Sequence, residues 1–367
     1  MGDLEIADRL GLIMFQQASG VEVDLTQRIA RQLAKGIDGP QWAERQLAEV
    51  AHLRASWERV VSDWIVRSRE TSAGVVRQAG EAGERSALAD LRAALLGSAL
   101  ESRLPGARAV LGLAEELSGA IASTKYGILR AAEDIFRKVV ADTSGTVLLG
   151  SQTRRGAAQQ ILDKLISKGL AGFTDRKGRR WDLASYVEMA ARTTTQRAMV
   201  KAHTDTLQSR GVQLVMVSNA PQECKLCRPW ENKILSLTGE GRQELQVKSA
   251  VSAEIVTVEV AGGLEEAKRA GLMHPNCRHS VSAYLPGLTR PASSDPADPE
   301  GDAARQRLRA LERQVRAAKM REAAALDDRA RKDARAEVAA WRSKIREHVA
   351  STTAKRQPQR EQIGKAR

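Results

Sequence analysis

Aromatic residues are scarce in this sequence, and a long apolar run is missing. Phe, Trp and Tyr together make up 3% of the 367 residues, whereas alanine-rich stretches are frequent. Because alanine favours helices and β-sandwiches draw on aromatic and β-branched residues, this composition favours a helical fold. An apolar run of roughly 20 residues is needed to cross a bilayer, so we expect no membrane-spanning segment and no membrane partner.

A secretory signal is missing as well. Residues 1–5 read MGDLE, which is acidic and offers neither a basic start nor an apolar core. We therefore expect the chain to be made and kept in a cytosol, where thiols stay reduced. The three cysteines also leave one over in any scheme of pairs, so no disulfide framework is predicted.

The sequence lacks the common nucleotide-binding and deaminase motifs. Neither G-x-x-x-x-G-K-S/T nor G-x-G-x-x-G occurs. A zinc deaminase needs H-x-E followed by P-C-x-x-C. Here residues 203–205 read HTD, and Pro221 stands three residues before Cys224, so both halves of that signature fail. We expect no enzymatic activity and no small-molecule substrate.

Positive charge is in excess, and it is concentrated near the C-terminus. The net charge is +13, and residues 303–367 hold 19 lysines and arginines against 8 acidic residues, a net +11. Such a tail predicts an acidic partner, for example nucleic acid, an anionic membrane surface or an acidic protein. The alternative interpretation is a solvated helix face with an excess of arginine.

The patterns of apolar and turn residues divide the chain into four parts. We expect an N-terminal helical region (1–146), an α+β domain (147–285), a Pro-rich linker (286–302) and a basic helical tail (303–367). The fold class that follows is α+β and predominantly helical, with a small sheet in the central domain.

Local signals place individual helices and strands. Asp24 is expected to cap one helix that ends at Gly36, and Asp182 to cap another that ends at Gly211. A further helix is expected to carry six apolar residues on one face: Leu47, Val50, Leu53, Trp57, Val60 and Trp64. Strands are expected within residues 212–217, 233–237 and 255–260.

The three cysteines indicate one metal site. Cys224 and Cys227 form a CxxC turn, and residues 274–279, HPNCRH, supply a second hook. A Cys₃His set is soft and tetrahedral, so we predict a single structural zinc ion. Its expected ligands are Cys224, Cys227 and Cys277 with either His274 or His279. Four protein ligands leave no position open for water, which favours a structural ion over a catalytic one.

Other interpretations of the same residues remain open. The cysteines are also compatible with a chance cluster of small buried side chains, with a redox pair, or with a nucleophile beside a histidine. The wider alternatives are a zinc-dependent enzyme with Glu223 or Asp205 as the base, and a DNA-binding zinc regulator. Arg192 is expected to pair with Glu188 or Glu223 inside the domain.

Three segments carry a characteristic order of motifs. They are GRRWDLASYVEMAARTTTQRA (178–198), VQLVMVSNAPQECKLCRPWENKILSLTG (212–239) and GLMHPNCRHSVSAYLPG (271–287). Together they resemble the tailed-phage minor capsid proteins, the head-morphogenesis proteins related to the minor head protein of phage Mu. Residues 306–324 and 355–367 look like the arginine-rich tail of that family. Relatives have a cysteine where this chain has His279, which leaves the choice between His274 and His279 open.

The resemblance implies a structural minor capsid protein that takes part in head morphogenesis. It would be made in the bacterial host cytoplasm, located in the virion, and bound to the portal or major capsid protein at the portal or inner head surface. Double-stranded DNA is a further expected partner, contacted through phosphates without sequence preference. The basic residues expected to make these contacts are Arg305, Arg307, Arg309, Arg313, Arg316, Lys319 and Arg321.

Overall fold

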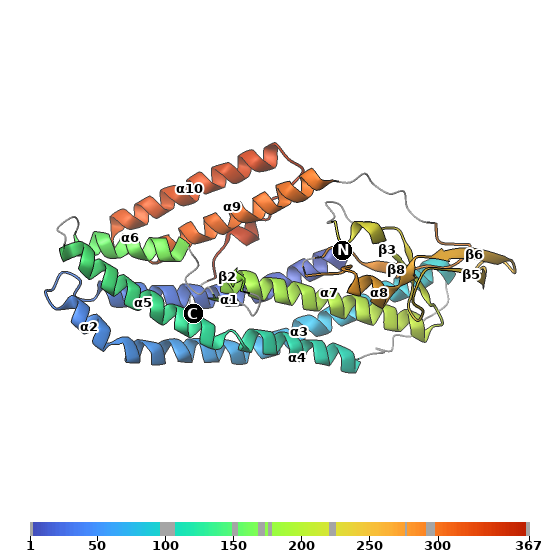
Figure 1. Ribbon diagram of the computed structural model, residues 1–367, viewed down its shortest axis with the longest axis horizontal. Helices are drawn as coiled ribbons and strands as arrows, with labels where there is room; N and C mark the ends of the chain where they lie inside the picture. The colour runs from blue at the N-terminus through green and yellow to red at the C-terminus, as the bar shows by residue number, and fades with distance from the viewer. Residues whose placement is uncertain are drawn as a thin grey trace. The chain divides into compact units, whose positions relative to one another are not determined.

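The chain is predominantly helical, with short strands between residues 173 and 283 (Figure 1). The computed structural model describes residues 3–95, 107–148, 153–167, 173–174, 178–219, 225–275, 277–290 and 298–364. The predicted α+β, predominantly helical fold class is confirmed. Cys224, Pro221 and Glu223 lie outside the described residues.

The elements are named in chain order. The helices are α1 (Asp3–Ala34), α2 (Trp42–Ala48), α3 (Val50–Leu95), α4 (Ala107–Ala122), α5 (Lys125–Leu148), α6 (Arg154–Ser167), α7 (Leu183–Ser209), α8 (Leu264–Arg269), α9 (Pro299–Ala323) and α10 (Asp328–Ala350). The strands are β1 (Phe173–Thr174), β2 (Arg180–Trp181), β3 (Leu214–Val217), β4 (Ile234–Ser236), β5 (Gln243–Lys248), β6 (Ile255–Val260), β7 (Gly262–Gly263) and β8 (Val281–Ala283). Two 3₁₀ helices are η1 (Arg228–Trp230) and η2 (Pro358–Glu361).

The chain forms two compact units that are interleaved along the sequence. Unit 1 comprises Met1–Gly11, Thr71–Leu117 and Met189–Ala303, and unit 2 comprises Leu12–Glu70, Ser118–Glu188 and Ala304–Arg367. Helices α1, α3, α4, α7 and α9 each contribute residues to both units. The four-part division expected from the sequence stays a prediction, since compact packing and independent folding are different properties.

Unit 2 is built around buried aromatic side chains. Trp57 packs edge-on against Phe136, with ring centroids 6.2 Å apart, and Trp64 is buried as well. The indole Nε1 of Trp42 donates to the backbone oxygen of Leu33 at 2.9 Å. Trp57 and Trp64, two members of the apolar face predicted for this helix, therefore lie in the core of unit 2.

Two expectations about the first helices are wrong. Helix α1 runs unbroken through Asp24, which pairs with Arg28 at 3.0 Å instead of starting a helix. The capping preference of aspartate is a local signal, and burial of upstream apolar residues such as Met14 outweighs it. Leu47 is 47% exposed, because α2 ends at Ala48 and places this residue on a different helix from the rest of the predicted stripe.

Capping signals at the other helix ends are confirmed. The Asp182 carboxylate accepts a hydrogen bond from the backbone N–H of Ser185 at 2.8 Å at the start of α7. Gly36 and Gly211, which follow α1 and α7, have φ of 59° and 78°. These left-handed conformations are favourable for glycine because it has no Cβ.

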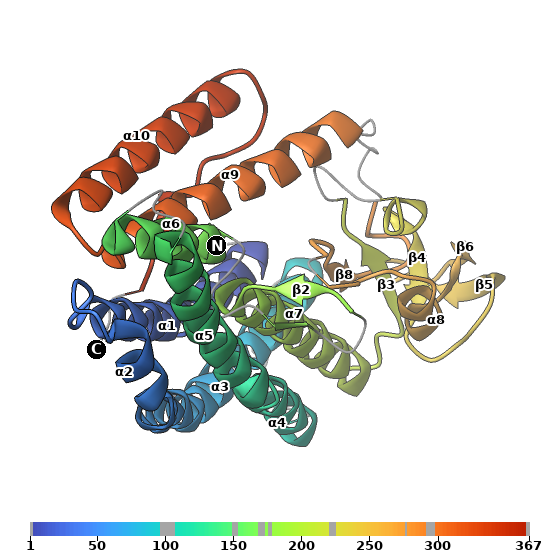
Figure 2. The same cartoon turned by 60° about the vertical axis from the view of Figure 1, so that its left-hand side comes forward.

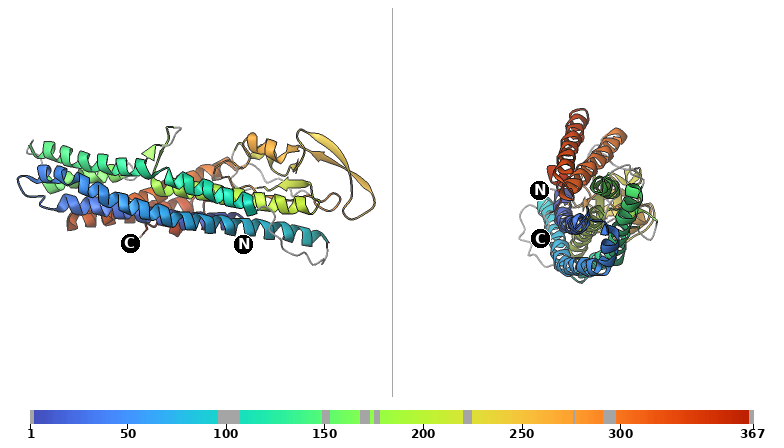
Figure 3. Two further views of the ribbon diagram at one scale, coloured as in Figure 1. Left: turned by 90° about the horizontal axis from the view of Figure 1, so that it is seen from below. Right: turned by 90° about the vertical axis from the view of Figure 1, so that its left-hand side faces the viewer.

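Helices α9 and α10 form a hairpin with its own apolar core (Figures 1 and 2). The buried residues of this core are Leu308, Leu311, Val315, Ala318, Val338, Ile345 and Ala354. Asp327 caps α10 by accepting from the backbone N–H of Ala330 at 2.8 Å. The right panel of Figure 3 shows the two helices next to each other, in orange and red. The amphipathic helices predicted in residues 303–367 are thereby confirmed.

Residues 354–364, the C-terminal strap, fold back within unit 2. Arg360 forms an ion pair with Glu188 of α7. Glu361 is only 1% exposed and accepts a hydrogen bond from Arg356 at 2.6 Å. At the end of the strap, the backbone N–H of Gly364 donates to Ser19 Oγ of α1 at 3.0 Å. The strap thus connects the segment after α10 to α1 and α7.

Unit 1 contains a four-stranded sheet and a separate two-stranded ribbon. The sheet has the order β7-β4-β3-β8, antiparallel except for the β4–β7 pair. Strands β5 and β6 pair antiparallel from Gln243 opposite Val260 to Lys248 opposite Ile255, drawn in gold in the left panel of Figure 3. The strands predicted within residues 212–217, 233–237 and 255–260 are confirmed.

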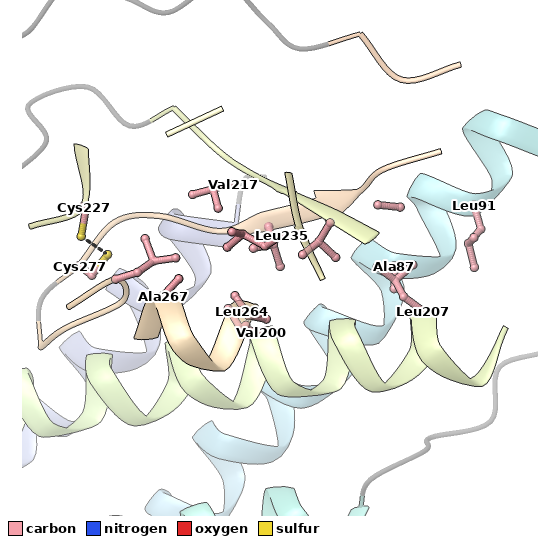
Figure 4. Packing of buried hydrophobic residues seen from close by; sticks show 14 residues of the cluster. Ala87, Leu91, Val200, Leu207, Val217, Cys227, Leu235, Leu264, Ala267 and Cys277 are labelled. Atoms are coloured by element: carbon pink, nitrogen blue, oxygen red, sulfur yellow. Dashed lines mark hydrogen bonds between the residues drawn. The ribbon is translucent and has the colours of Figure 1, made fainter. Parts of the chain in front are cut away.

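The core of unit 1 joins the four-stranded sheet to helices and to two cysteines (Figure 4). Val217 and Leu235 come from the sheet, and Leu264 comes from α8. Cys227 and Cys277 belong to the same buried cluster. The cysteines are therefore part of the hydrophobic core that holds this unit together.

Candidate metal centre

Two separate segments of unit 1 bring the described cysteines together. Cys227 stands at the start of η1, where Pro229 fixes the backbone of the tight turn. Cys277 lies between α8 and β8. Both thiols are buried, with exposed fractions of 1% and 9%.

The sulfur atoms of these cysteines are in contact. Cys227 Sγ lies 3.5 Å from Cys277 Sγ, although the two residues are 50 positions apart in the sequence (Figure 4). One ligand atom each from Cys227, His274 and Cys277 lies within 4.8 Å of the others. The structure therefore brings together Cys227 of the CxxC turn and the second hook.

His279 is buried against Cys277. Its Nδ1 lies 3.4 Å from Cys277 Sγ, and its Nε2 lies 2.7 Å from Glu231 Oε1. The backbone N–H of His279 also donates to Cys277 Sγ at 3.3 Å. Gln196 of α7 donates to the backbone oxygen of His279 at 2.5 Å, which holds this loop against the helix.

His274 is more exposed than His279. Its Nδ1 lies 2.8 Å from the backbone oxygen of Pro275. The side chain also borders a groove lined by residues of α4, α7 and α8. Both histidines of the predicted hook therefore lie near Cys277, and His274 is the one whose ligand atom is within 4.8 Å of those of both cysteines.

The surroundings favour an ionised thiol at Cys277. The hydrogen bond with Cys227 is the largest cause that lowers the pKa of Cys277, to about 4, against the opposing effect of burial. Burial alone would lower the pKa of His279, but its bonds to Cys277 and Glu231 outweigh burial and raise it. A thiolate at neutral pH is the form that binds a soft cation.

The residues fit a zinc ion. Zinc binds sulfur at about 2.3 Å and nitrogen at about 2.0–2.1 Å, so tetrahedral ligand atoms lie about 3.5–3.8 Å apart. The separations of 3.5 Å between the sulfurs and 3.4 Å from sulfur to His279 Nδ1 are close to this value. Thiolate and imidazole are also the ligand types that zinc prefers.

Two other residues that the sequence analysis named, Arg192 and Asp205, form ion pairs. Arg192 pairs with Asp8 of α1 at 2.7 Å, so the expected pairing with Glu188 is wrong. The local spacing on one helix favoured Glu188, whereas tertiary packing supplied a carboxylate from another helix. Asp205, a candidate base in the enzyme alternative, pairs with Lys201 at 2.5 Å.

Two residues of the centre were missed by sequence reasoning, Glu231 and Gln196. Both contact the loop that carries Cys277 through His279. Gln196 lies on α7, far from the cysteines in the sequence, and offers no local signal. Glu231 follows Cys227 by four residues, so its nearness to the CxxC turn was the only sequence signal.

The predicted DNA-contact residues lie in α9, and they differ in burial and in their partners. Arg309 bonds to Glu312 at 2.8 Å, Arg316 to the backbone oxygen of Arg360 at 2.8 Å, and Lys319 to Gln362 at 2.6 Å. These side chains support the fold of unit 2.

The rest of this set ranges from buried to exposed. Arg321 is buried and bonds to Ser167 at 2.6 Å, and Arg305 is half-buried. Arg307 and Arg313 are exposed. Further exposed basic residues of α10 are Arg329, Arg331, Lys332, Arg335, Lys344 and Arg346.

The fold and the site define a predominantly helical α+β protein with a buried cysteine and histidine cluster. The family described as phage minor capsid protein 2 matches residues 13–350, and the chain belongs to this family. The resemblance to tailed-phage minor capsid proteins is thereby confirmed, and the protein is a structural component of the phage virion. Neither the curated proteins nor the solved structures include a match to the chain. Within the described ranges, every helix is too short or too polar to cross a bilayer.

Proposed function

We propose that this minor capsid protein binds the portal or the inner head surface, takes part in head morphogenesis and is held together by one structural zinc ion. Membership of the capsid family over residues 13–350 supports the structural role, and it favours a protein without catalytic activity. The placement at the portal extends the resemblance found in the sequence.

The observation that carries the zinc proposal is the burial of the cysteines in the core of unit 1. Cys227 and Cys277 belong to the same apolar cluster as the sheet and α8. An ion bound there would cross-link two segments that are 50 residues apart. Such an ion stabilises the folded state, because the unfolded chain does not present the ligands together. Cys224 is the proposed third thiolate.

The second part of the proposal concerns packaged DNA. Exposed lysines and arginines on a helical hairpin attract phosphates without reading bases. Arg307 and Arg313 are the members of the predicted set that are exposed, and α10 adds further exposed basic residues. We propose that this surface contacts DNA, whereas Arg309, Arg316, Lys319 and Arg321 mainly support the fold.

The test is to purify phage heads assembled with and without the portal protein and to measure the protein and its zinc. We expect the chain in mature heads, its loss from heads without portal, and about one zinc per chain in the purified, reduced protein. Equal incorporation without portal would contradict portal binding in favour of the shell. A zinc content near zero would contradict the metal centre.

A further inference from the structure

We propose that the outer edge of β5 is an interaction surface at which two copies of this chain pair antiparallel, related by a two-fold axis at Gln246. The proposal concerns unit 1 alone and goes beyond the proposed binding at the portal. Strands β5 and β6, labelled in Figure 1, form a two-stranded ribbon, and among the described residues no other strand pairs with β5. Its second edge therefore offers backbone N–H and C=O groups to a further strand.

The residues that face this open edge follow from the hydrogen-bond pattern of the ribbon. Ser249 N–H donates to the backbone oxygen of Glu254 at 2.8 Å, so these two residues form a hydrogen-bonded pair next to the turn. Hydrogen-bonded and non-hydrogen-bonded pairs alternate along antiparallel strands. The backbone N–H and C=O groups of Glu244, Gln246 and Lys248 therefore point away from β6.

The side chains of β5 alternate between a polar face and an apolar face. Glu244, Gln246 and Lys248 are exposed. Leu245 and Val247 are half-buried and pack against an apolar cluster that includes residues of β3 and β6. A strand added at the open edge would therefore extend both faces of the ribbon, and its own side chains need to match each face.

Inside the ribbon, the two charged residues of β5 do not face an opposite charge across the strand pair. Glu244 lies opposite Glu259, and Lys248 lies opposite Ile255. Glu259 is itself paired with Arg242 at 3.6 Å. Opposite charges directly across a strand pair are stabilising, and like charges are destabilising. A strand that brings a cation to Glu244 and a carboxylate to Lys248 therefore suits this edge.

A second copy of β5 is such a strand. Antiparallel pairing centred on Gln246 places Glu244 of each copy opposite Lys248 of the other, and Leu245 opposite Val247. Charges on an edge strand ordinarily discourage pairing. Here the two-fold arrangement turns both charges into attractive pairs, and each pair occurs twice. The contact uses the same surface on both copies, so it closes as a dimer.

The two neighbouring registers that keep the same residues on the open edge are less favourable. Shifting the centre by one residue towards the N-terminus places Lys248 opposite Arg242, which brings two like charges together. Shifting it by one residue towards the C-terminus requires Ala250, whose backbone N–H already donates to the oxygen of Pro286 at 2.8 Å. The register centred on Gln246 is therefore favoured over both.

The experiment is sedimentation velocity of the full-length protein over a range of concentrations at low salt. The paired edge is short, so we expect a weak dimer that dissociates on dilution. Glu244→Lys and Lys248→Glu should each weaken dimerisation about 10-fold or more, because each replaces two opposite-charge pairs with two like-charge pairs. Glu265→Lys reverses a charge that is 74% exposed on α8, outside the ribbon, and is the matched control. It should leave the dimer intact.

Mixing the two variants tests the register. Glu244→Lys has two lysines on the edge and Lys248→Glu has two carboxylates, so an equimolar mixture should form a heterodimer of about wild-type affinity. The double variant Glu244→Lys/Lys248→Glu should dimerise by itself. If neither the mixture nor the double variant recovers the dimer, the pairing centred on Gln246 is overturned.

A backbone variant tests whether the strand edge itself makes the contact. Gln246→Pro removes an N–H that points away from β6, and proline is tolerated at such a position of an edge strand. The variant should keep the wild-type circular dichroism spectrum and remain monomeric. A wild-type protein that is monomeric at every concentration would overturn the proposal, as would equal loss of the dimer in Glu265→Lys. If the wild type is monomeric and Gln246→Pro fails to enter phage heads, the edge binds another capsid component, which overturns the second copy as its partner.

Discussion

Individual arginines of α9 differ in what they contact. Glu312 is fully buried and would be an isolated charge without Arg309, its partner at 2.8 Å. Arg321 is likewise buried, beside Ser167. Arg307 and Arg313 are exposed, so their charges are available to a partner. Residue type alone predicted one DNA-binding set. Burial separates the exposed Arg307 and Arg313 from members such as Arg309 and Arg321, which contact other residues of the protein.

Replacing both Arg307 and Arg313 with alanine should weaken DNA binding and reduce its salt dependence. Each phosphate contact contributes about 0.9 to the slope of log K against log salt, so two lost contacts lower the slope by about 2. Fluorescence anisotropy with a DNA duplex over a salt series measures this. Arg242→Ala, whose side chain is 80% exposed in unit 1, is the matched control. An unchanged slope in the double variant would contradict DNA contact at these positions.

The ion pair of Arg192 could be predicted from the sequence, but its partner could not. An arginine on a largely buried helix predicted an ion pair, and the ion pair exists. Its partner Asp8 belongs to α1, however, and no local spacing relates the two. The grouping of Cys227, His274 and Cys277 was predictable because cysteine and histidine are rare here and their spacing is specific. The contact of Glu231 with His279 depends on three-dimensional placement instead.

Among the elements, the ends of α7 were predictable and the start of α1 was not. Asp182 and Gly211 act on their immediate neighbours, so their signals survive in any tertiary context. Asp24 carries the same signal, but burial of its surroundings keeps α1 continuous. Strand β5 was missed because its sequence, QELQVK, has little β-propensity and forms a strand only by pairing with β6.

A largely buried acid of α1, Glu22, contacts the start of α7. Glu22 of α1 accepts a hydrogen bond from the backbone N–H of Ala184 at 3.2 Å. Burial is the main cause that raises the pKa of Glu22 from 4.5 to about 8, the charge of Asp182 adds to it, and Arg316 opposes it. Because the folded state holds this proton more tightly than the unfolded chain, stability should fall as pH rises from about 4.5 to about 8.

Glu22→Gln should remove this part of the pH dependence. Glutamine has the same shape, stays neutral and still offers an oxygen to Ala184. Between pH 5 and pH 8 the wild type should lose about 1–3 kcal/mol more of its unfolding free energy than the variant, less than the full shift since the side chain keeps some exposure. Urea unfolding at both pH values measures this, with the exposed Glu70→Gln as control. Parallel losses in wild type and Glu22→Gln would contradict the assignment.

For the whole molecule, the proposed zinc ion links distant parts of the sequence within unit 1. Residues of the four-stranded sheet and of α8 belong to the same buried cluster as Cys227 and Cys277. A ligand that binds only the folded state stabilises it by RT ln(1 + [L]/Kd), about 4 kcal/mol at a thousandfold excess over Kd. The ion should therefore contribute a large fraction of the stability of the unit that contains it.

Removing zinc with a chelator should lower the thermal unfolding midpoint, and stoichiometric zinc should restore it. Differential scanning calorimetry under reducing conditions measures both steps. Cys277→Ser should unfold at a lower temperature and should not respond to the chelator, which controls for other effects of that reagent. A chelator that leaves the wild-type midpoint unchanged would contradict a structural ion.

The interleaving of the two units determines how much of this chain must be synthesised before each unit can pack. Unit 1 needs residues from the N-terminal helix through Ala303, and unit 2 needs the C-terminal strap, which binds α1 at Ser19. Unit 1 therefore cannot close before its last segment, which ends at Ala303, has been synthesised, and unit 2 cannot close before the strap. A product that stops before the strap leaves Glu188 of α7 without Arg360. Only a chain that includes the strap can therefore complete the packing of unit 2.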